Sequence, residues 1–325
     1  MTLPRRRFLH LAAGAAAFPA LSRFAWAQAY PARPVRIVVG FAAASGADIL
    51  GRLMGQWLSE RLGQQFVIEN RTGGGTNIAT EAVVRSAPDG HTLLLVTPAN
   101  AINATLYEKL NFNFIRDIAP VASIMRTPLV MLVNPSFPAK SVPEFIAYAK
   151  ANPGKLSVAS SGTGSPNHMA GELFKAMTGV DMVHVPYRGG GPVITDLLGG
   201  QVQLTFPTTT AAIEYIRAGT LRALAVTTAT RSEVLPDIPT MSDFLPGYEA
   251  SVWYGVGAPR NTPAEIVDKL NNEINAALAD PRMKAKLAEL GGTVLPGSAA
   301  DFGKLIAEET DKWGKVVKFA GIKAD

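Results

Sequence analysis

The side chains that most often catalyse reactions occur in this sequence without the spacing that catalysis needs. The chain has no cysteine, which excludes thiol catalysis, disulfides and thiolate metal sites. Of its four histidines, His91, His168 and His184 lie beyond residue 27, and none belongs to a His-Glu-x-x-His zinc motif. A Walker phosphate loop and a Gly-x-Ser-x-Gly nucleophile elbow are also missing from the sequence. We therefore expect no catalytic residue, no metal ligand and no bound cofactor.

Two further patterns favour structural roles. Residues 73–75 (GGG) begin like a dinucleotide-binding fingerprint, but Ile78 stands where its third glycine should allow close helix packing. His184 lies between valines in a strand pattern, which indicates a structural histidine.

Two loops of small residues each precede a predicted helix. Residues 42–47 (AAASGA) come before a helix at Asp48, and residues 160–165 (SSGTGS) come before a helix near Asn167. Free backbone N–H groups and the helix dipole make such an end a site for anions, so one loop from each of two domains can hold a carboxylate between them. In the alternative interpretation, both loops are ordinary connections in which Asp48 and Ser165 cap the helices.

The elements that position these loops alternate along the chain. Short β-branched runs are followed by longer helical patterns, which predicts an α/β fold with largely parallel strands. Apolar residues at helical spacing predict a helix over residues 48–62. Strands are predicted at 35–41, 66–69, 92–97, 129–133, 156–160, 182–186, 203–206, 224–227 and 252–258.

Capping patterns mark three helix starts, in which a Ser or Thr is followed three residues later by an acidic residue. The last two predict a helix ending near residue 280 and a final helix ending near residue 320. The pairs are Ser141 with Glu144, Thr262 with Glu265, which has Pro263 at the first helical position, and Ser298 with Asp301.

The N-terminal segment resembles an export signal. Residues 5–10 (RRRFLH) are similar to the twin-arginine motif, and residues 25–27 (AWA) place small residues where a signal peptidase cuts. The apolar run over residues 11–21 is too short to span a bilayer. We expect cleavage after Ala27, which would leave the mature protein in the periplasm and not inserted in the membrane.

The apparent basicity of the chain belongs to this signal. The 325 residues include 31 basic and 26 acidic ones, and four arginines but no acid lie in residues 1–27. The remaining 298 residues therefore carry 27 basic and 26 acidic side chains. A net charge of +1 argues against a nucleic-acid partner, which would require clustered Lys and Arg.

The domain organisation follows from two apolar runs. Residues 129–133 and 252–258 both end before a proline-containing loop, and if both cross between domains, one domain is discontinuous. We predict a first domain from residues 28–130 and 250–325 and a second from residues 131–249. Two crossings make a hinge suited to closure around a ligand, although a single linker between consecutive domains remains an alternative.

From Tyr30 onward the chain resembles the Bug family, the periplasmic solute-binding proteins of tripartite tricarboxylate transporters. The resemblance covers the whole mature chain. The matching segments are 67–71 (VIENR), 87–90 (APDG), 152–156 (NPGKL) and, most specifically, 183–189 (VHVPYRG) running into 196–202 (DLLGGQV).

The resemblance implies a two-domain periplasmic binding protein of the Venus-flytrap type, similar to type II, with a ligand cleft between the domains. It also implies a small carboxylate ligand, held largely by backbone amides and ordered water and delivered to membrane transporter subunits. The loops at 41–48 and 161–168 are then the binding loops. With a third loop after residue 206, the expected ligand-binding residues are Phe41, Ala43, Ser45, Gly46, Ala47, Asp48, Ser161, Gly162, Thr163, Gly164, His168, Pro207 and Thr208.

Two departures from the family pattern bear on the ligand. The first loop lacks the usual proline and is alanine-rich. Where many relatives carry an acidic residue and an asparagine, this chain has Pro207 and Thr208. A buried ammonium needs a counter-charge, so we expect a dicarboxylate, tricarboxylate or aromatic acid rather than an amino acid.

Two other functions stay open at this stage. An exported hydrolase or isomerase would use Asp48 or His168 as a base, although the search for catalytic motifs argues against an enzyme. A ligand-sensing partner of a membrane receptor would use the same fold. Delivery to a membrane protein requires no oligomer, so we expect a monomer.

Overall fold

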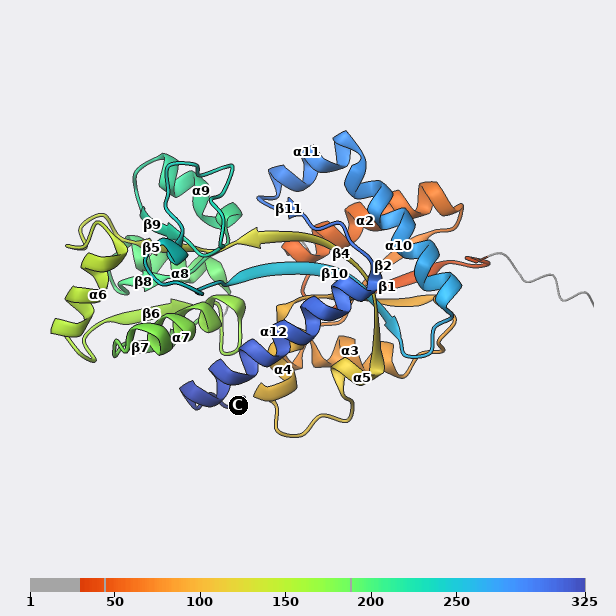
Figure 1. Ribbon diagram of the computed structural model, residues 1–325, viewed down its shortest axis with the longest axis horizontal. Helices are drawn as coiled ribbons and strands as arrows, with labels where there is room; N and C mark the ends of the chain where they lie inside the picture. Colours follow the sequence, from red (N-terminus) through yellow and green to blue (C-terminus); the bar gives the residue numbers. More distant parts are fainter. Residues whose placement is uncertain (1–29, 44, 188, 325) are drawn as a thin grey trace, which may run out of the picture.

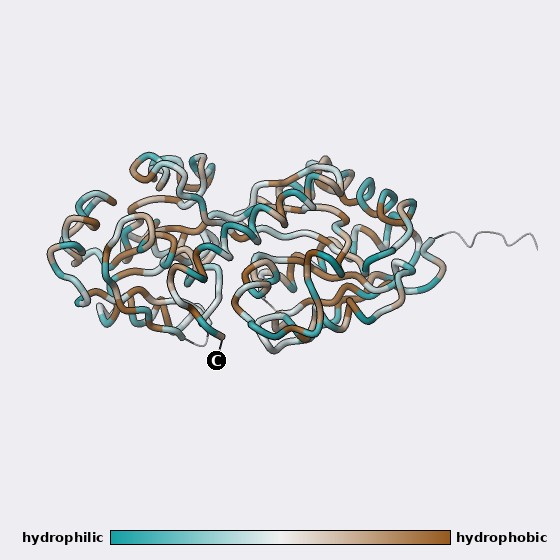
Figure 2. Tube along the Cα trace, turned by 60° about the horizontal axis from the view of Figure 1, so that its bottom comes forward, coloured by the Kyte–Doolittle hydropathy of each residue, from teal (hydrophilic) through white to brown (hydrophobic). Residues whose placement is uncertain are grey.

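The computed structural model describes residues 30–43, 45–187 and 189–324. The predicted export motif and the cleavage site after Ala27 lie outside the described residues. The chain forms two β-sheets, each flanked by helices (Figure 1). In Figure 2 two lobes are visible, and hydrophobic segments lie mostly inside each lobe. Both lobes therefore have an apolar interior.

The first sheet has six strands in the order β11-β4-β10-β3-β1-β2. Its central strands are fully buried, because helices cover both faces (Figure 1). The strands are β1 (Val35–Val39), β2 (Phe66–Asn70), β3 (Thr92–Val96), β4 (Ile118–Pro128), β10 (Ser251–Pro259) and β11 (Thr293–Val294).

The second sheet has five strands in the order β7-β6-β8-β5-β9. All of its strands come from the middle of the chain. They are β5 (Val130–Val133), β6 (Ser157–Ser160), β7 (Val183–Pro186), β8 (Leu204–Thr205) and β9 (Arg222–Val226).

The helices divide between the two sheets according to their place in the sequence (Figure 1). With the first sheet lie α2 (Gly46–Leu62), η1 (Gly74–Thr76), α3 (Asn77–Val84), α4 (Pro98–Leu106), α5 (Phe114–Asp117), α10 (Ala264–Ala279), α11 (Pro281–Glu289) and α12 (Ala299–Ala320). Between β5 and β10 in the sequence come α6 (Val142–Ala151), α7 (Pro166–Thr178), α8 (Gly190–Leu198), α9 (Thr209–Arg217) and η2 (Met241–Asp243).

The prediction of largely parallel strands is wrong. Among the described strand pairs, four are parallel, namely β1 with β2 and β3, and β6 with β7 and β8. The other five are antiparallel, and four of these involve β10 or β5 next to the points where the chain changes sheets. A strand that returns from the other sheet enters its own sheet from the opposite end, so it runs against its neighbours.

The chain passes between the two sheets at two adjacent places. Only Leu129 separates β4 in the first sheet from β5 in the second, and residues 227–250 lead from β9 back to β10. Thr227 joins the two crossings, since its hydroxyl accepts from the Leu129 N–H (2.9 Å) and donates to the Ala250 carbonyl (2.5 Å). Helix α12 also packs against both α4 of the first lobe and α7 of the second.

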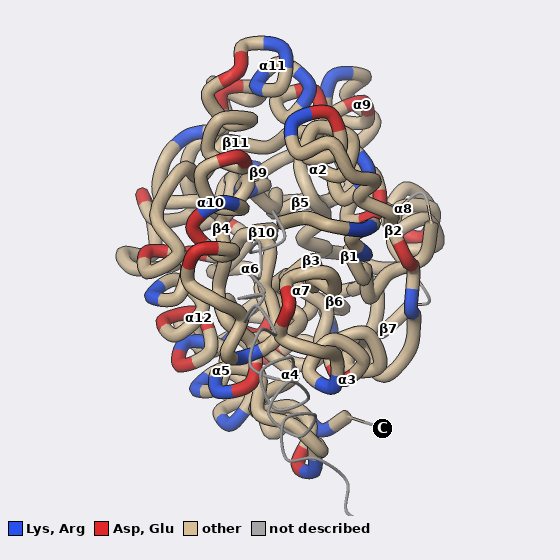
Figure 3. Tube along the Cα trace, turned by 90° about the vertical axis from the view of Figure 1, so that its right-hand side faces the viewer, with Lys and Arg blue, Asp and Glu red and all other residues tan. Residues whose placement is uncertain are grey.

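Helices α10, α11 and α12 each carry residues of both charge signs along their length, as Figure 3 shows. This mixture fits the balanced charge of residues 28–325. Within the described part of the chain, no helix is both long and apolar enough to cross a bilayer.

Helix starts follow the capping patterns in part. The Ser298–Asp301 capping box is confirmed, and the Ser165 hydroxyl accepts from the His168 N–H (3.4 Å). The pattern at Thr262 is wrong, because Pro263 is the N-cap of α10 and the Thr262 hydroxyl donates to the Pro259 carbonyl. At Ser141 only one of the two capping-box hydrogen bonds is present. The Ser141 hydroxyl accepts from the Glu144 N–H, but the Glu144 carboxylate accepts from the Lys140 N–H rather than from the Ser141 N–H.

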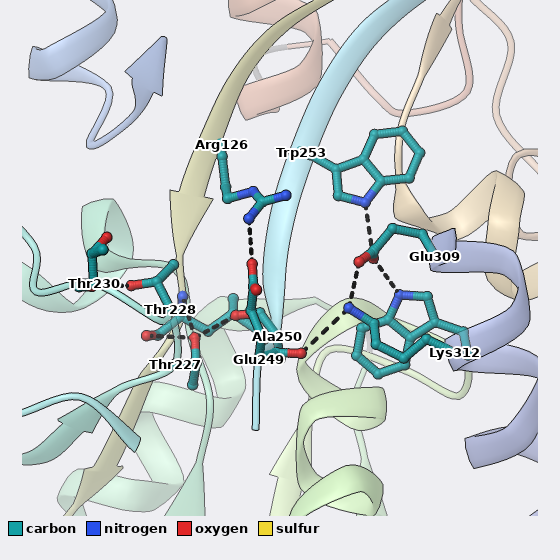
Figure 4. Close-up of polar contacts among 11 residues, drawn as sticks. Arg126, Thr227, Thr228, Thr230, Glu249, Ala250, Trp253, Glu309 and Lys312 are labelled. Carbon is teal, nitrogen blue, oxygen red and sulfur yellow. Dashed lines mark hydrogen bonds and ion pairs between the residues drawn. The ribbon is translucent and has the colours of Figure 1, made fainter. Parts of the chain in front are cut away.

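A buried carboxylate joins α12 to the second crossing (Figure 4). Glu309, which is 6% exposed, accepts from the indole N–H groups of Trp253 (3.0 Å) and Trp313 (2.8 Å). Lys312 pairs with the other oxygen of Glu309 and also donates to the Glu249 carbonyl (3.3 Å). Two of these contacts, from Trp253 to Glu309 and from Lys312 to the Glu249 carbonyl, anchor α12 at the crossing, and the other two hold Glu309 in place within the helix.

We expect the substitution Glu309→Ala to lower the free energy of unfolding by about 3 kcal/mol, because it leaves two indole N–H groups without their acceptor and Lys312 without its counter-charge. Chemical denaturation measures the loss. Glu308→Ala on the same helix is the matched control, since its side chain is 64% exposed and its loss should stay within about 0.5 kcal/mol. Equal losses for the two variants would contradict the role of the buried network.

Candidate functional site

A cavity lies between the two sheets, at the ends of several strands. Its volume is about 300 Å³, and its walls come from loops after β1, β3, β6 and β8 and from the crossing strands. Ligands of open α/β sheets bind beyond the carboxyl ends of the strands. The lining residues are Phe41, Ser45, Gly46, Ala47, Thr97, Leu129, Ser161, Pro166, Asn167, Gly190, Pro207, Thr208, Ala211, Val252 and Tyr254.

An adjoining cavity of about 510 Å³ shares several of these walls. Phe41, Ser45, Ser161, Pro166 and Gly190 line both cavities. The second cavity adds the rest of the loop after β6 and, on the opposite wall, residues of η1 and α4. The two cavities therefore form one cleft between the lobes.

Four helices begin at the first cavity. Gly46 opens α2, Pro166 opens α7, Gly190 opens α8, and Thr208 is the N-cap of α9. The first N–H groups of a helix have no partner within the helix, and its dipole places partial positive charge there. The cleft can therefore offer many backbone donors to an anion.

The described residues that line the two cavities include no Asp, Glu, Lys, Arg or His. Two smaller cavities that share Gly46, Asn167, Gly190 or Thr208 with the first are likewise lined by described residues without charge. Donors in this cleft are thus backbone N–H groups, hydroxyls and the amide side chains of Asn103 and Asn167. The chemistry fits holding a ligand, since no described lining residue is an acid, a base or a thiol.

The structure brings most of the predicted site residues together. Phe41, Ser45, Gly46, Ala47, Ser161, Pro207 and Thr208 line the first cavity, and Gly162, Thr163 and Gly164 line the second. Three residues lie elsewhere. Ala43 is exposed at the turn of the first loop, whereas Asp48 (2% exposed) and His168 (3% exposed) are buried behind the two loops.

Asp48 supports the first loop and does not cap its helix. The cap of α2 is the Ser45 hydroxyl, which accepts from the Asp48 N–H (3.2 Å). The Asp48 carboxylate accepts from the Asn70 amide (2.9 Å) and from the Arg52 guanidinium (3.0 Å). Because the same Asn70 amide nitrogen donates to the Phe41 carbonyl (2.9 Å), Asp48 holds the first loop through Asn70.

Hydroxyl groups hold the second loop. The Ser165 hydroxyl donates to the Gly162 carbonyl (2.6 Å), and the Ser161 hydroxyl donates to the Asn167 side chain (2.8 Å). Gly162 and Gly164 have φ angles of +137° and +75°, which only glycine adopts readily. The loop thus depends on glycine for its path and on serine for its hydrogen bonds.

The floor of the cleft comes from the crossings. Leu129, Val252 and Tyr254 lie on or beside the strands that join the sheets. Burial raises the pKa of Tyr254 to about 12, so its phenol is neutral at physiological pH. The Val130 N–H donates to the Pro207 carbonyl (2.9 Å), which ties the third loop to the first crossing.

Several lining residues were missed by the sequence analysis. Thr97 ends a predicted strand, and Gly190 lies in a glycine run before a helix, which is the signal already used for the other two loops. Leu129, Val252 and Tyr254 carry no polar signal that separates them from core residues. The other missed residues of the first cavity are Pro166, Asn167 and Ala211. Those of the second cavity are Gly40, Gly73, Gly75, Thr76, Ala99, Asn103, Leu106, Tyr107, Ser165 and Gly189.

Comparisons with known proteins agree with this architecture. The model of the tripartite tricarboxylate transporter family receptor matches residues 50–322. Protein BugT of Bordetella pertussis is 36% identical over 300 residues, which are 91% of this chain and 92% of that protein. A UPF0065 protein of Pseudomonas sp. strain P51 is 35% identical over 292 residues, or 89% of this chain and 87% of that protein.

Solved structures are similar over nearly their whole length. R. palustris Rpa4515 with adipate has a TM-score of 0.80 at 40% identity and covers 90% of this chain and 99% of its own. The Rhodopseudomonas palustris protein MatC with bound malate has a TM-score of 0.77 at 33% identity, covering 89% and 100%. The periplasmic binding protein BugD reaches 0.77 at 33% identity, covering 91% and 100%.

These matches confirm the resemblance predicted from the sequence, and with it the two-domain α/β fold of a periplasmic binding protein with a cleft between its domains. The chain belongs to the receptor family of the tripartite tricarboxylate transporters.

Proposed function

We propose that this protein captures a small organic carboxylate in the periplasm and delivers it to the membrane subunits of a tripartite tricarboxylate-type transporter. The observation that supports this most is the cavity at which four helices begin and whose described lining has no charged side chain. Helix N-termini are ready sites for anions. Residues 28–130 with 250–325 form one proposed domain and residues 131–249 the other, and they close on the ligand.

The carboxylate end of the ligand is proposed to lie between the first and second loops. There it meets the N-terminal turns of α2 and α7 and the hydroxyls of Ser45 and Ser161. Each helix end stabilises a negative charge by about 0.3–1 kcal/mol at the surface and by up to about 2 kcal/mol where it is partly buried. Several such ends together replace the water that the carboxylate loses.

The rest of the ligand is proposed to be apolar or to end in a second oxygen-bearing group. Phe41, Leu129, Val252 and Tyr254 offer apolar surface, and the Thr208 hydroxyl can donate a hydrogen bond. No described lining residue is acidic, so an ammonium group would lack a counter-charge. Similar proteins were solved with adipate and malate, which supports a dicarboxylate, while tricarboxylates and aromatic acids stay within the proposed class.

The cellular setting rests on the sequence and on the family. The predicted twin-arginine signal, with removal after Ala27, would export the chain to the periplasm. A monomer suffices, because the proposed site lies within one chain.

The ligand class can be tested by thermal shift and calorimetry on residues 28–325 with adipate, malate, citrate, benzoate and glutamate. We expect one of the non-amino acids to bind, and at a hundred times its Kd to stabilise the fold by about 2.7 kcal/mol. Selective binding of glutamate would contradict the exclusion of amino groups. Failure of every acid to bind would contradict carboxylate capture.

The position of Thr208 gives a sharper test. We expect Thr208→Asp to weaken binding of the carboxylate at least tenfold, because two like charges within a few ångströms repel by about 1–4 kcal/mol. Asp is also a good N-cap, so α9 should remain folded. Thr208→Asn, similar in size but neutral, is the matched control in calorimetry. Equal weakening by both variants would place the anion away from Thr208.

A further inference from the structure

Two histidines stack behind the second loop of the cleft. His168 on α7 is 3% exposed, and His184 on β7 is half-buried. Their rings are nearly parallel, at 13°, with centroids 3.6 Å apart. Strand β7 pairs with β6, and the second loop connects β6 to α7. The stacked pair therefore lies directly under residues 161–164.

Both rings are hydrogen-bonded to this loop. The backbone N–H of Gly164 donates to Nδ1 of His168 (3.0 Å). Nε2 of His184 lies 2.7 Å from the Ser160 hydroxyl, which donates to the Gly162 carbonyl (3.1 Å). An imidazole nitrogen accepts a hydrogen bond only when it carries no proton. His168 is therefore neutral in this arrangement, with its proton on Nε2.

Glu172 selects this tautomer. Its Oε1 lies 3.6 Å from Nε2 of His168 and 2.9 Å from Nζ of Lys175. Burial alone would raise the pKa of Glu172, but hydrogen bonds from His168 and Lys175 lower it below its usual value. The ionised carboxylate attracts the proton to Nε2, which leaves the lone pair of Nδ1 facing Gly164.

Glu172 and Lys175 of α7 and His184 of β7 are the titratable groups that face His168 among the described residues. Burial, followed by the charge of a protonated His168, lowers the pKa of His184 to about 4. His184 thus stays neutral between pH 7 and pH 5.

We propose that His168 is a positioning residue for the carboxylate site, and that its neutral form holds the Gly162–Gly164 backbone in the binding geometry. Protonation of Nδ1 places an N–H against the Gly164 N–H, breaks their hydrogen bond and releases the loop. This proposal rests on the proposed function of the cleft. Ligand binding then favours neutral His168, so affinity falls as the pH falls, by at most tenfold per pH unit for one proton.

The first test needs no ligand. The backbone amide of Gly164 is followed by NMR in ¹⁵N-labelled protein from pH 8 to pH 5, a range that includes the usual imidazole titration near 6.5. We expect its signal to titrate in the wild type. His168→Asn is the matched variant, because Oδ1 takes the place of Nδ1 as acceptor and does not titrate, so the Gly164 signal should stay constant.

The second test measures the affinity for adipate by calorimetry over the same pH range. In His168→Asn, affinity should fall with pH only because adipate itself becomes protonated. A steeper fall of affinity with pH in the wild type is therefore due to His168. His168→Leu, which has no acceptor, should weaken binding at pH 8 more than His168→Asn does. Glu172→Gln should move the midpoint of the Gly164 titration to lower pH, because it removes the negative charge that favours a protonated imidazole.

A Gly164 signal that does not change with pH, or one that changes equally in wild type and His168→Asn, would overturn the proposal. If His168→Asn fails to fold, the proposal is still tested by two measurements: the pH dependence of the Gly164 signal in the wild type, and the shift of its midpoint in Glu172→Gln. If adipate fails to bind at pH 8, adipate is the wrong ligand, and the NMR titration tests His168 independently of that result.

Discussion

Taking the proposed anionic ligand out of water without an opposing charge is the constraint on which the rest of this structure depends. The described walls of the cleft offer a ligand no Lys, Arg or His. Its donors are uncharged backbone N–H groups, hydroxyls and amides, which are weaker singly than charged donors and must converge. Convergence explains why four helices begin at one cavity. It also explains why most residues of the loops after β1 and β6 are small, because a bulky side chain there would keep a ligand away from the backbone.

Backbone N–H groups can bind a ligand only when their loops are held in place. The hydrogen bonds that hold the third loop also connect the cleft to the crossings between the sheets. Pro207 of the third loop accepts from Val130 at the start of β5, and the Thr209 hydroxyl of α9 donates to the Pro128 carbonyl at the end of β4. Thr227 joins the two crossings to each other. A rotation of one lobe against the other would therefore displace the floor and the third loop together, which would couple the proposed closure to contact with a ligand.

Local sequence predicted the elements better than their directions. Nine strands were found near their predicted places because each is a short apolar run between loops. Strand β4 was missed, since Pro120, Ser123 and Arg126 interrupt its pattern; Pro120 is tolerated where the register with β10 shifts at Gly257. The antiparallel pairs of β10 and β5 could not be predicted locally, because strand direction depends on which sheet the chain comes from. The loops of small residues allowed much of the cleft to be predicted from the sequence. The apolar residues of its floor could not be predicted, because in the sequence they look the same as residues of the hydrophobic core.

Asp48 and His168 show how a side chain can matter to a cleft that it does not line. Each is the third residue of its helix, and each gives its N–H to the serine that caps the same helix. Each side chain turns back under its loop and accepts a hydrogen bond there, from Asn70 in one lobe and from Gly164 in the other. The two lobes thus support their loops by the same arrangement, with a carboxylate as the acceptor in one lobe and an imidazole in the other. A carboxylate keeps its acceptor role over most of the pH range, whereas an imidazole loses it on protonation, so the two sides of the cleft differ in their sensitivity to protons.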